Sequence, residues 1–326
     1  MRRRILLAAL GALAATGLLV ACGGDDDTDS VGATQPSPAA SAAATSGPTQ
    51  DPNAYARPDL LVEAKDLAAK LSDKSIAIVD VRAKDAYAAG HIPGAVWYDP
   101  AKLKDSDDKL HVIKDTDFGK GLGDLGIDNS KRIVVYDANT GLTAARFWWV
   151  LDYYSFTNAA ILNGGWDKWK ADGLQESKET PVVTPVVFKT TVNDKVICAT
   201  DYVAQKSQSK DPNVVILDVR SAAEFSGADV RAPAVKGGHV PGAVNLDWTT
   251  SVTTSKPQVW KPAAELRKQF ESAGIKPGVE VITYCQTAVR GAHSLFTLRL
   301  VGYGQVRNYD GSWAEWGSLK DTPVQN

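Results

Sequence analysis

The sequence predicts an α/β protein with two tandem domains, each a mainly parallel sheet flanked by helices. The first observation is an internal repeat, because Asp80-Val81-Arg82 and His91-Ile92-Pro93-Gly94-Ala95 recur as Asp218-Val219-Arg220 and His239-Val240-Pro241-Gly242-Ala243. A repeat of this length implies two copies of one domain. The second is the length of 326 residues, for which about two domains are expected. The third is that short apolar runs alternate with helical patterns, which is typical of parallel sheets.

The predicted strands are continuous apolar runs, as expected of strands buried on both faces. They are Ile76–Val79 and Ile133–Tyr136 in the first copy, and Val214–Leu217 and Val281–Tyr284 in the second. Residues 59–71 place leucines at helical spacing and predict a helix. Each copy also has a helical pattern after its second apolar run, formed by Phe147, Val150, Leu151 and Tyr154 and by Leu295, Leu298 and Val301.

The two copies differ at the residue that ends the second apolar run. This residue is Asp137 in the first copy and Cys285 in the second, at the same separation from His91 and His239. Ligands of open α/β sheets bind beyond the carboxyl ends of the strands. The exchange of a carboxylate for a thiol at this place therefore predicts one working site, at Cys285, and one retired site.

The residues after Cys285 are suited to hold an anionic sulfur. The loop Cys285-Gln286-Thr287-Ala288-Val289-Arg290 joins a buried strand to a helix, so its backbone N–H groups can converge on one point where the helix N-terminus adds partial positive charge. Both effects favour the thiolate, which is the nucleophilic form of cysteine. Arg290 adds a fork of donors suited to an oxyanion. The alternative is a buried cysteine that only begins a helix.

The first residues predict an export signal. Arg2-Arg3-Arg4 precede an apolar run from Ile5 to Val20, which is shorter than the roughly 20 residues of a spanning helix. Leu19-Val20-Ala21-Cys22 is similar to the lipobox of bacterial lipoproteins, whose cysteine carries fatty acyl groups such as palmitate. We expect cleavage before Cys22, a lipid anchor in the cell membrane and an extracytoplasmic body. An uncleaved anchor and a plain secretory peptide are the alternatives, and both also place the body outside the cytoplasm.

Composition and the repeat together give the expected domain limits. Residues 1–21 are the signal peptide, and residues 22–57, rich in Gly, Asp, Ser, Thr, Ala and Pro, are a lipidated and disordered tether. The first copy covers residues 58–178 and the second covers residues 197–326. Residues 179–196 are the interdomain linker.

Charge and residue counts exclude several kinds of partner. The net charge of −2 provides no basic field for nucleic acid, so an anionic substrate must be captured by local groups. The four histidines and scattered cysteines show no metal-ligand spacing, and we expect neither a metal nor another cofactor. Besides Cys22 there are only Cys198 and Cys285, too few for a disulfide framework. Cys198 lies in an apolar run and is interpreted as buried, with a resolving thiol as the alternative.

Residues 58–326 resemble the rhodanese (thiosulfate sulfurtransferase) family. Tyr87-Ala88-Ala89-Gly90-His91-Ile92-Pro93-Gly94-Ala95 resembles the N-terminal signature of that family, and residues 306–316 resemble its C-terminal signature. The resemblance implies an inactive first domain, a catalytic second domain and a persulfide on Cys285. It also implies a small anionic sulfur donor such as thiosulfate, and a thiol or cyanide as acceptor. We expect a monomer.

The resemblance also implies roles for individual residues. Cys285 corresponds to the sulfur-carrying nucleophile, and Gln286, Thr287, Ala288, Val289 and Arg290 correspond to the loop that surrounds the persulfide. Arg220 corresponds to an arginine that faces substrate anions, with an ion pair to Asp218 or Glu224 as the alternative. The residue after the cysteine is basic in some thiosulfate-using members but is Gln286 here. Ala288 stands where many members have glycine, so we expect no glycine-like backbone angle there.

The remaining candidates are interpreted as structural. His91 and His239 precede Pro-Gly turns, while His293 is one turn into the helix and could approach the site. Asp137 cannot hold sulfur, so the first domain is expected to form one wall of the active-site cleft rather than a second site. A phosphatase-like enzyme is disfavoured because its phosphate-binding loop is one residue longer. A sulfur carrier or redox sensor without turnover is the other alternative.

Overall fold

The computed structural model of the protein describes residues 51–326. The expected signal peptide, Cys22 and most of the expected tether lie outside the described residues. Within residues 51–326, no helix is both long enough and apolar enough to cross a membrane.

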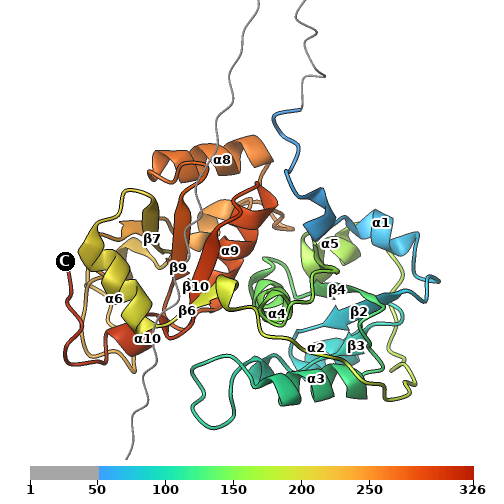
Figure 1. Cartoon of the computed structure of the whole chain (residues 1–326). Helices are drawn as coiled ribbons and strands as arrows, with labels where there is room; N and C mark the ends of the chain where they lie inside the picture. Colours follow the sequence, from blue (N-terminus) through green and yellow to red (C-terminus); the bar gives the residue numbers. More distant parts are fainter. Residues whose placement is uncertain (1–50) are drawn as a thin grey trace, which may run out of the picture. The chain divides into compact units, whose positions relative to one another are not determined.

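Two five-stranded sheets form the framework of the described chain (Figure 1). The first has the strand order β1-β5-β4-β2-β3, and the second has the corresponding order β6-β10-β9-β7-β8. Every pair of neighbouring strands is parallel. The same strand order in both halves confirms the predicted fold class.

The elements of the first domain are η1 (Pro58–Leu60), β1 (Leu61–Val62), α1 (Ala64–Ala68), β2 (Ile76–Asp80), α2 (Lys84–Ala89), β3 (Val96–Trp97), η2 (Pro100–Leu103), α3 (Asp115–Asp124), β4 (Arg132–Tyr136), α4 (Leu142–Tyr153), β5 (Ala159–Leu162) and α5 (Gly165–Ala171). Those of the second are η3 (Asp194–Val196), β6 (Ile197–Cys198), α6 (Thr200–Ser209), β7 (Val214–Asp218), α7 (Ala222–Phe225), β8 (Val244–Asn245), η4 (Trp248–Ser251), α8 (Ala263–Ser272), β9 (Glu280–Tyr284), α9 (Val289–Leu300), β10 (Val306–Tyr309) and α10 (Ser312–Trp316).

The predicted helix over residues 59–71 is wrong in part. Leu61 and Val62 form strand β1 instead, and the helix that follows begins at Ala64 and ends at Ala68. Strand β1 pairs with β5 at the edge of the first sheet, with Leu61 opposite Ile161 and Val62 opposite Leu162. Pairing with the sheet outweighs the local helical pattern because propensity is only a weak preference beside tertiary contacts.

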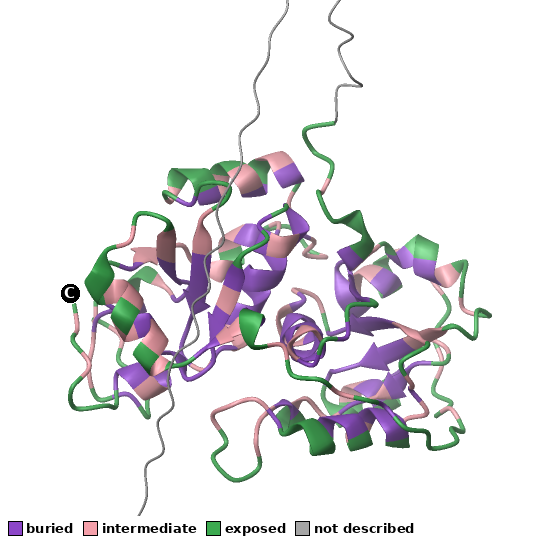
Figure 2. Ribbon diagram, viewed as in Figure 1, coloured by how far each residue is buried: buried purple, intermediate pink, exposed green. Residues whose placement is uncertain are grey.

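The central helices α4 and α9 pack against each other. Trp148 of α4 meets Phe296 of α9 edge to face, with ring centroids 5.0 Å apart. Figure 2 shows both helices mostly buried, and a single cluster of apolar side chains includes residues of both domains. Asp137 and Cys285 directly follow strands β4 and β9, and each begins the loop that leads into α4 or α9. The packing of these helices therefore brings the two strand–helix loops toward the interface between the domains.

The expected linker packs on the first domain. Phe188 is buried and its ring contacts those of Phe118 and Phe156, at 6.4 and 5.2 Å between centroids. The N–H of Val186 donates to the carbonyl of Gly123 at 3.0 Å. This segment therefore covers α3 before the chain enters β6.

Candidate active site

Cys285 lies at the carboxyl end of β9, directly before the loop that leads into α9. Its side chain is buried, with an exposed fraction of 1%. The carboxyl edge of a parallel sheet is where such folds bind ligands, and the N-terminal end of a helix favours negative charge. Cys285 thus has the position that the sequence predicted for a thiolate.

Ser312 holds the loop from the side. Its hydroxyl oxygen accepts the N–H of Cys285 at 3.2 Å and the N–H of Ala288 at 3.1 Å, while it donates to the carbonyl of Tyr309 at 2.8 Å. The start of α10 adds two bonds, from the N–H of Trp313 to Cys285 O and from that of Ala314 to Gln286 O, both at 2.9 Å. These contacts fix both ends of the loop.

The role of Ser312 was not predicted, although the repeat contained a signal. Ser312 corresponds to Gly165 in the first copy, and both have a positive φ, +51° and +53°. A Cβ at Gly165 would lie 2.5 Å from the carbonyl oxygen of Asp137. The second copy therefore differs from the first not only by its thiol but also by a hydroxyl against the thiol loop.

The expectation that Ala288 has an ordinary backbone conformation is wrong. Its φ is +61° and its ψ is 1°, in the left-handed region. This conformation costs roughly 1–2 kcal/mol for a residue with a Cβ. It is maintained because Ser312 accepts the Ala288 N–H and the side-chain amide of Asn308 donates to the Ala288 carbonyl at 3.0 Å. Gly141 caps α4 of the first domain in the same left-handed conformation.

Several amides of the thiol loop remain free to bind an anion. The N–H groups of Gln286, Thr287, Val289 and Arg290 form no hydrogen bond to another residue of the described chain. Such a set of unpaired backbone donors at a helix N-terminus is a concave site for negative charge. A sulfur anion on Cys285 would lie within it.

The first domain shows what such a loop encloses when no thiol is present. Both carboxylate oxygens of Asp137 accept backbone N–H groups of its own loop. The donors are Asn139 at 3.1 Å, Gly141 at 3.0 Å, Thr143 at 2.9 Å and Ala144 at 3.4 Å. Burial raises the pKa of Asp137, and these four bonds oppose that effect. In the first domain, the carboxylate of Asp137 therefore occupies the anion site of its own loop.

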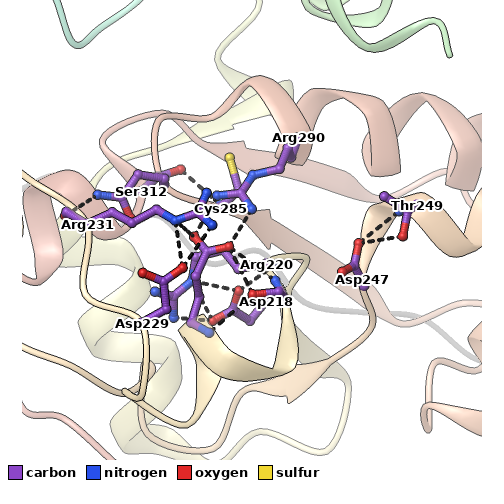
Figure 3. Close-up of polar contacts among 12 residues, drawn as sticks. Asp218, Arg220, Asp229, Arg231, Asp247, Thr249, Cys285, Arg290 and Ser312 are labelled. Carbon is purple, nitrogen blue, oxygen red and sulfur yellow. Dashed lines mark hydrogen bonds and ion pairs between the residues drawn. The ribbon is translucent and has the colours of Figure 1, made fainter.

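Arg290 lies beside the sulfur of Cys285 (Figure 3). Its guanidinium forms two bonds with the carboxylate of Glu224, at 2.7 and 2.8 Å. Burial opposes the charge of Arg290, but the contacts with Glu224 and Cys285 raise its pKa overall. Glu224 is itself buried, and it forms a capping box with Ser221 at the start of α7. Arg290 is thus a permanent cation whose orientation is fixed by a carboxylate that sequence reasoning considered only as a partner of Arg220.

Arg220 forms the ion pair with Asp218 that was considered as the alternative to a substrate contact. Its exposed fraction is 1%, and it bonds to both carboxylate oxygens of Asp218 and to the carbonyl of Gly238. The guanidinium also stacks over Trp313 at 4.5 Å.

The first domain repeats this arrangement at Arg82. Arg82 bonds to Asp80 and to the carbonyl of Gly90, and it stacks over Trp166 at 4.5 Å. Because the same contacts occur beside a loop without a thiol, this arrangement does not require a sulfur site and favours a structural role for both arginines.

The other loop residues differ in how open they are. The side-chain amide of Gln286 is turned away and donates to the carbonyls of Arg231 and Ala232, at 2.8 and 3.3 Å. Thr287 and Val289 are partly exposed, whereas Ala288 is buried. The structure thus brings the loop and Arg290 around Cys285 but directs Gln286 to structural partners.

Cys198, His91, His239 and His293 all lie in structural settings. Cys198 is buried, and burial raises its pKa, which disfavours a reactive thiolate. His91 and His239 stack on Tyr87 and Phe225, at 3.9 and 3.6 Å. His293 stacks on Trp260 and bonds to the carbonyl of Thr140 in the first domain at 3.0 Å.

The described residues contain no group of three or more His, Cys, Asp or Glu side chains that could hold a metal ion.

The comparison with known proteins agrees with this geometry. The rhodanese-like domain family matches residues 63–172 and 201–319. The thiosulfate sulfurtransferase of Pseudomonas aeruginosa is 33% identical over 268 residues, which cover 82% of this chain and 97% of that protein. The sulfur carrier protein TtuD of Thermus thermophilus is 32% identical over 280 residues, 83% of this chain and 98% of that protein.

A solved structure shows the same architecture. The 3-mercaptopyruvate sulfotransferase SseA of Escherichia coli superposes with a TM-score of 0.70 and 28% identity, over 78% of this chain and 98% of its own. The matches span both halves of the described chain and include the loop of Cys285. The chain therefore belongs to the rhodanese family, with two rhodanese-like domains in tandem.

Proposed function

We propose that this protein is a thiosulfate sulfurtransferase that transfers sulfur through a persulfide on Cys285. The observation that carries the proposal is the placement of one buried thiol within a loop of unpaired amides beside Arg290. The relatives named as thiosulfate sulfurtransferases support thiosulfate as the donor.

In the first step, the Cys285 thiolate attacks the outer sulfur of thiosulfate. A sulfur–sulfur bond forms on Cys285 while the sulfur–sulfur bond of thiosulfate breaks, and its electron pair leaves with sulfite. The terminal sulfur of the new persulfide is anionic. The N–H groups of Gln286, Thr287 and Val289, together with the charge of Arg290, would stabilise it.

In the second step, a thiophilic acceptor attacks the terminal sulfur of the persulfide. With cyanide, a carbon–sulfur bond forms, thiocyanate leaves and the Cys285 thiolate is restored. A thiol acceptor would form a new persulfide in the same way. Because sulfite leaves before the acceptor reacts, the kinetics should be ping-pong.

Mass spectrometry of the intact protein tests the persulfide. Exposure to thiosulfate should add one sulfur atom, about 32 Da, and cyanide should remove it. Cys285→Ser should abolish both the mass change and turnover, whereas Cys198→Ser, which removes the other described thiol, should retain both. Turnover by Cys285→Ser would refute the proposal.

A sulfur carrier is the second candidate, and the similarity to the Thermus thermophilus sulfur carrier protein favours it. A carrier would also form the persulfide but would release it only to a dedicated partner. Repeated cyanide-dependent release of sulfite, at many turnovers per protein molecule, distinguishes the enzyme from the carrier.

We further propose that the protein is a monomeric, extracytoplasmic lipoprotein anchored to the cell membrane through Cys22. The support is the sequence around Arg2-Arg3-Arg4 and Leu19-Val20-Ala21-Cys22. Residues 22–57 would then be a flexible tether between the membrane and the catalytic body.

A further inference from the structure

A hairpin of the first domain extends to the active site of the second. It consists of residues 104–112, between η2 and α3 (Figure 1), and it is closed by a bridge between Lys104 and Val112. The N–H of Val112 donates to Oδ2 of Asp310 at 2.6 Å, and His111 lies 3.9 Å from Glu315. Asp310 is two residues from Ser312, which holds the thiol loop. The hairpin is therefore connected to the site through the segment that positions Cys285.

A second first-domain residue meets the same carboxylate. Arg146 of α4 donates from Nη1 to Oδ1 of Asp310 at 2.8 Å, and its guanidinium lies 4.4 Å from the ring centre of Trp149. Its exposed fraction is only 2%, yet Nε and Nη2 have no hydrogen-bond partner within residues 51–326. A buried guanidinium with unpaired donors is costly unless a further acceptor binds there.

Lys104 is the second cation of this cluster. It is partly buried and forms no ion pair with a carboxylate of the described chain. Burial and the charge of Arg146 lower its pKa, against the opposing effects of Asp310, Cys285 and Asp108. Lys104 is paired with Val112, whose N–H binds the same carboxylate of Asp310 as Arg146 does.

Arg146 keeps unpaired donors although it already binds Asp310. The same carboxylate accepts the N–H of Val112 from the hairpin that carries Lys104, while the charge of Arg290 is already matched by Glu224. A buried guanidinium with two free nitrogen donors, and a lysine of the adjoining hairpin without an ion pair in the described chain, form a site for an added oxyanion.

We propose that Lys104 and Arg146 of the first domain bind the sulfonate end of the sulfur donor while its outer sulfur reaches Cys285. This rests on the proposed function and extends it, because it makes the domain without a thiol a part of the donor site. The same cations would stabilise the charge that develops on sulfite as the sulfur–sulfur bond breaks. They would also give preference to donors with two negative charges.

The first experiment measures binding without chemistry. In the Cys285→Ser background, thiosulfate binding is measured by calorimetry for the protein with Lys104 intact and for Lys104→Met, Lys104→Arg and Lys102→Met. Lys102 is an exposed lysine of the same turn and is the matched control. We expect about a tenfold or greater loss of affinity for Lys104→Met, near-complete recovery for Lys104→Arg and no change for Lys102→Met. Equal affinity of Lys104→Met and Lys102→Met would overturn the proposal.

The second experiment separates the two half-reactions in the protein with Cys285. In ping-pong kinetics, kcat/KM for thiosulfate reports the first half-reaction and kcat/KM for cyanide reports the second. Lys104→Met should lower the thiosulfate value about tenfold or more and the cyanide value much less. An equal loss in both, together with a lower Tm, would indicate a structural role and contradict donor binding.

The binding experiment also distinguishes this inference from the proposed function. If Cys285 formed no persulfide while thiosulfate binding still depended on Lys104, the proposed reaction would fail and the anion site would stand. If the persulfide formed but thiosulfate affinity did not depend on Lys104, the proposed reaction would be supported and the anion site would be refuted. Arg146→Met is the less suitable variant because it leaves Asp310 buried without its cation.

Discussion

The hydroxyl of Ser312 accepts the N–H of Ala288 at 3.1 Å and holds that residue in the left-handed conformation, with φ +61°. The same oxygen accepts the N–H of Cys285. One side chain thereby determines the shape of the loop around the sulfur and compensates for its backbone strain. In the first domain, the corresponding loop is instead held by Asp137, whose carboxylate accepts four N–H groups.

Ser312→Ala should impair both activity and stability. The variant leaves two buried N–H groups without an acceptor, each at a cost of about 1–3 kcal/mol, and it frees Ala288 to leave its strained conformation. We expect kcat/KM for thiosulfate to fall at least about tenfold, with a lower free energy of unfolding. Ser318→Ala is the control, because Ser318 bonds to the carbonyls of Ala314 and Pro233 rather than to the loop. Wild-type kinetics for Ser312→Ala would show that the loop keeps its shape without this hydroxyl.

Arg220→Met should act on stability more than on donor use. Removing one partner of a buried ion pair typically costs about 3–5 kcal/mol, and Arg82→Met in the first domain should cost a similar amount. Arg290→Met removes the charge beside the sulfur and should lower kcat/KM for thiosulfate about ten- to a hundredfold. Denaturant unfolding and steady-state kinetics of the three variants provide the comparison. If Arg220→Met matched Arg290→Met in kinetics while Arg82→Met remained active, Arg220 would be a substrate residue after all.

The nucleophile and its loop could be predicted from the sequence because they lie within one short segment. The repeat identified Cys285 as the residue that differs from Asp137, and the residues after it indicated a turn before a helix. Arg290 could be predicted for the same reason. The parallel sheets followed from the alternation of buried runs and helices. The helix expected over residues 59–71 failed in part because β1 pairs with a strand about a hundred residues later.

The residues that were missed act across long separations in the chain. Glu224 orients Arg290, and Ser312 shapes the loop of Cys285, each from another element. Lys104 and Arg146, the residues of the proposed anion site, come from the other domain, so no local pattern could assign them to this site. For Ala288, the repeat held the signal in Gly141, which caps the matching helix with a positive φ. A comparison of the two copies at each helix start would have predicted it.

Acidification should weaken the fold through His293. This side chain is fully buried against Trp260, and burial lowers its pKa to about 4. In the unfolded chain the ordinary histidine pKa is about 6.5, so the unfolded state binds a proton first as pH falls. The contribution of neutral His293 to the free energy of unfolding is therefore complete above pH 6.5 and is lost as the pH falls toward 4. About 2 kcal/mol of the free energy of unfolding is lost between pH 6.5 and pH 5.

The test compares free energies of unfolding of wild type and His293→Phe across this pH range. Phenylalanine keeps an aromatic ring against Trp260 but cannot take up a proton. We expect its stability to change less between pH 6.5 and pH 5, even if it is lower overall because the bond to Thr140 is lost. Equal pH slopes for the two proteins would show that His293 does not cause the acid sensitivity.

The proposed anchor makes a prediction about location that is independent of catalysis. Cleavage before Cys22 and its acylation would give two or more chains, and two chains hold a protein to a membrane where one does not. The tether of about 35 residues would give the body a mean reach of roughly 30–35 Å from the membrane. Neither domain motif precedes residue 58, so activity should not require the anchor. Cys22→Ala, expressed in the native host, should leave the membrane fraction and retain sulfurtransferase activity. A variant that still sedimented with membranes, or a wild-type protein whose N-terminus was Met1, would rule out the lipoprotein form.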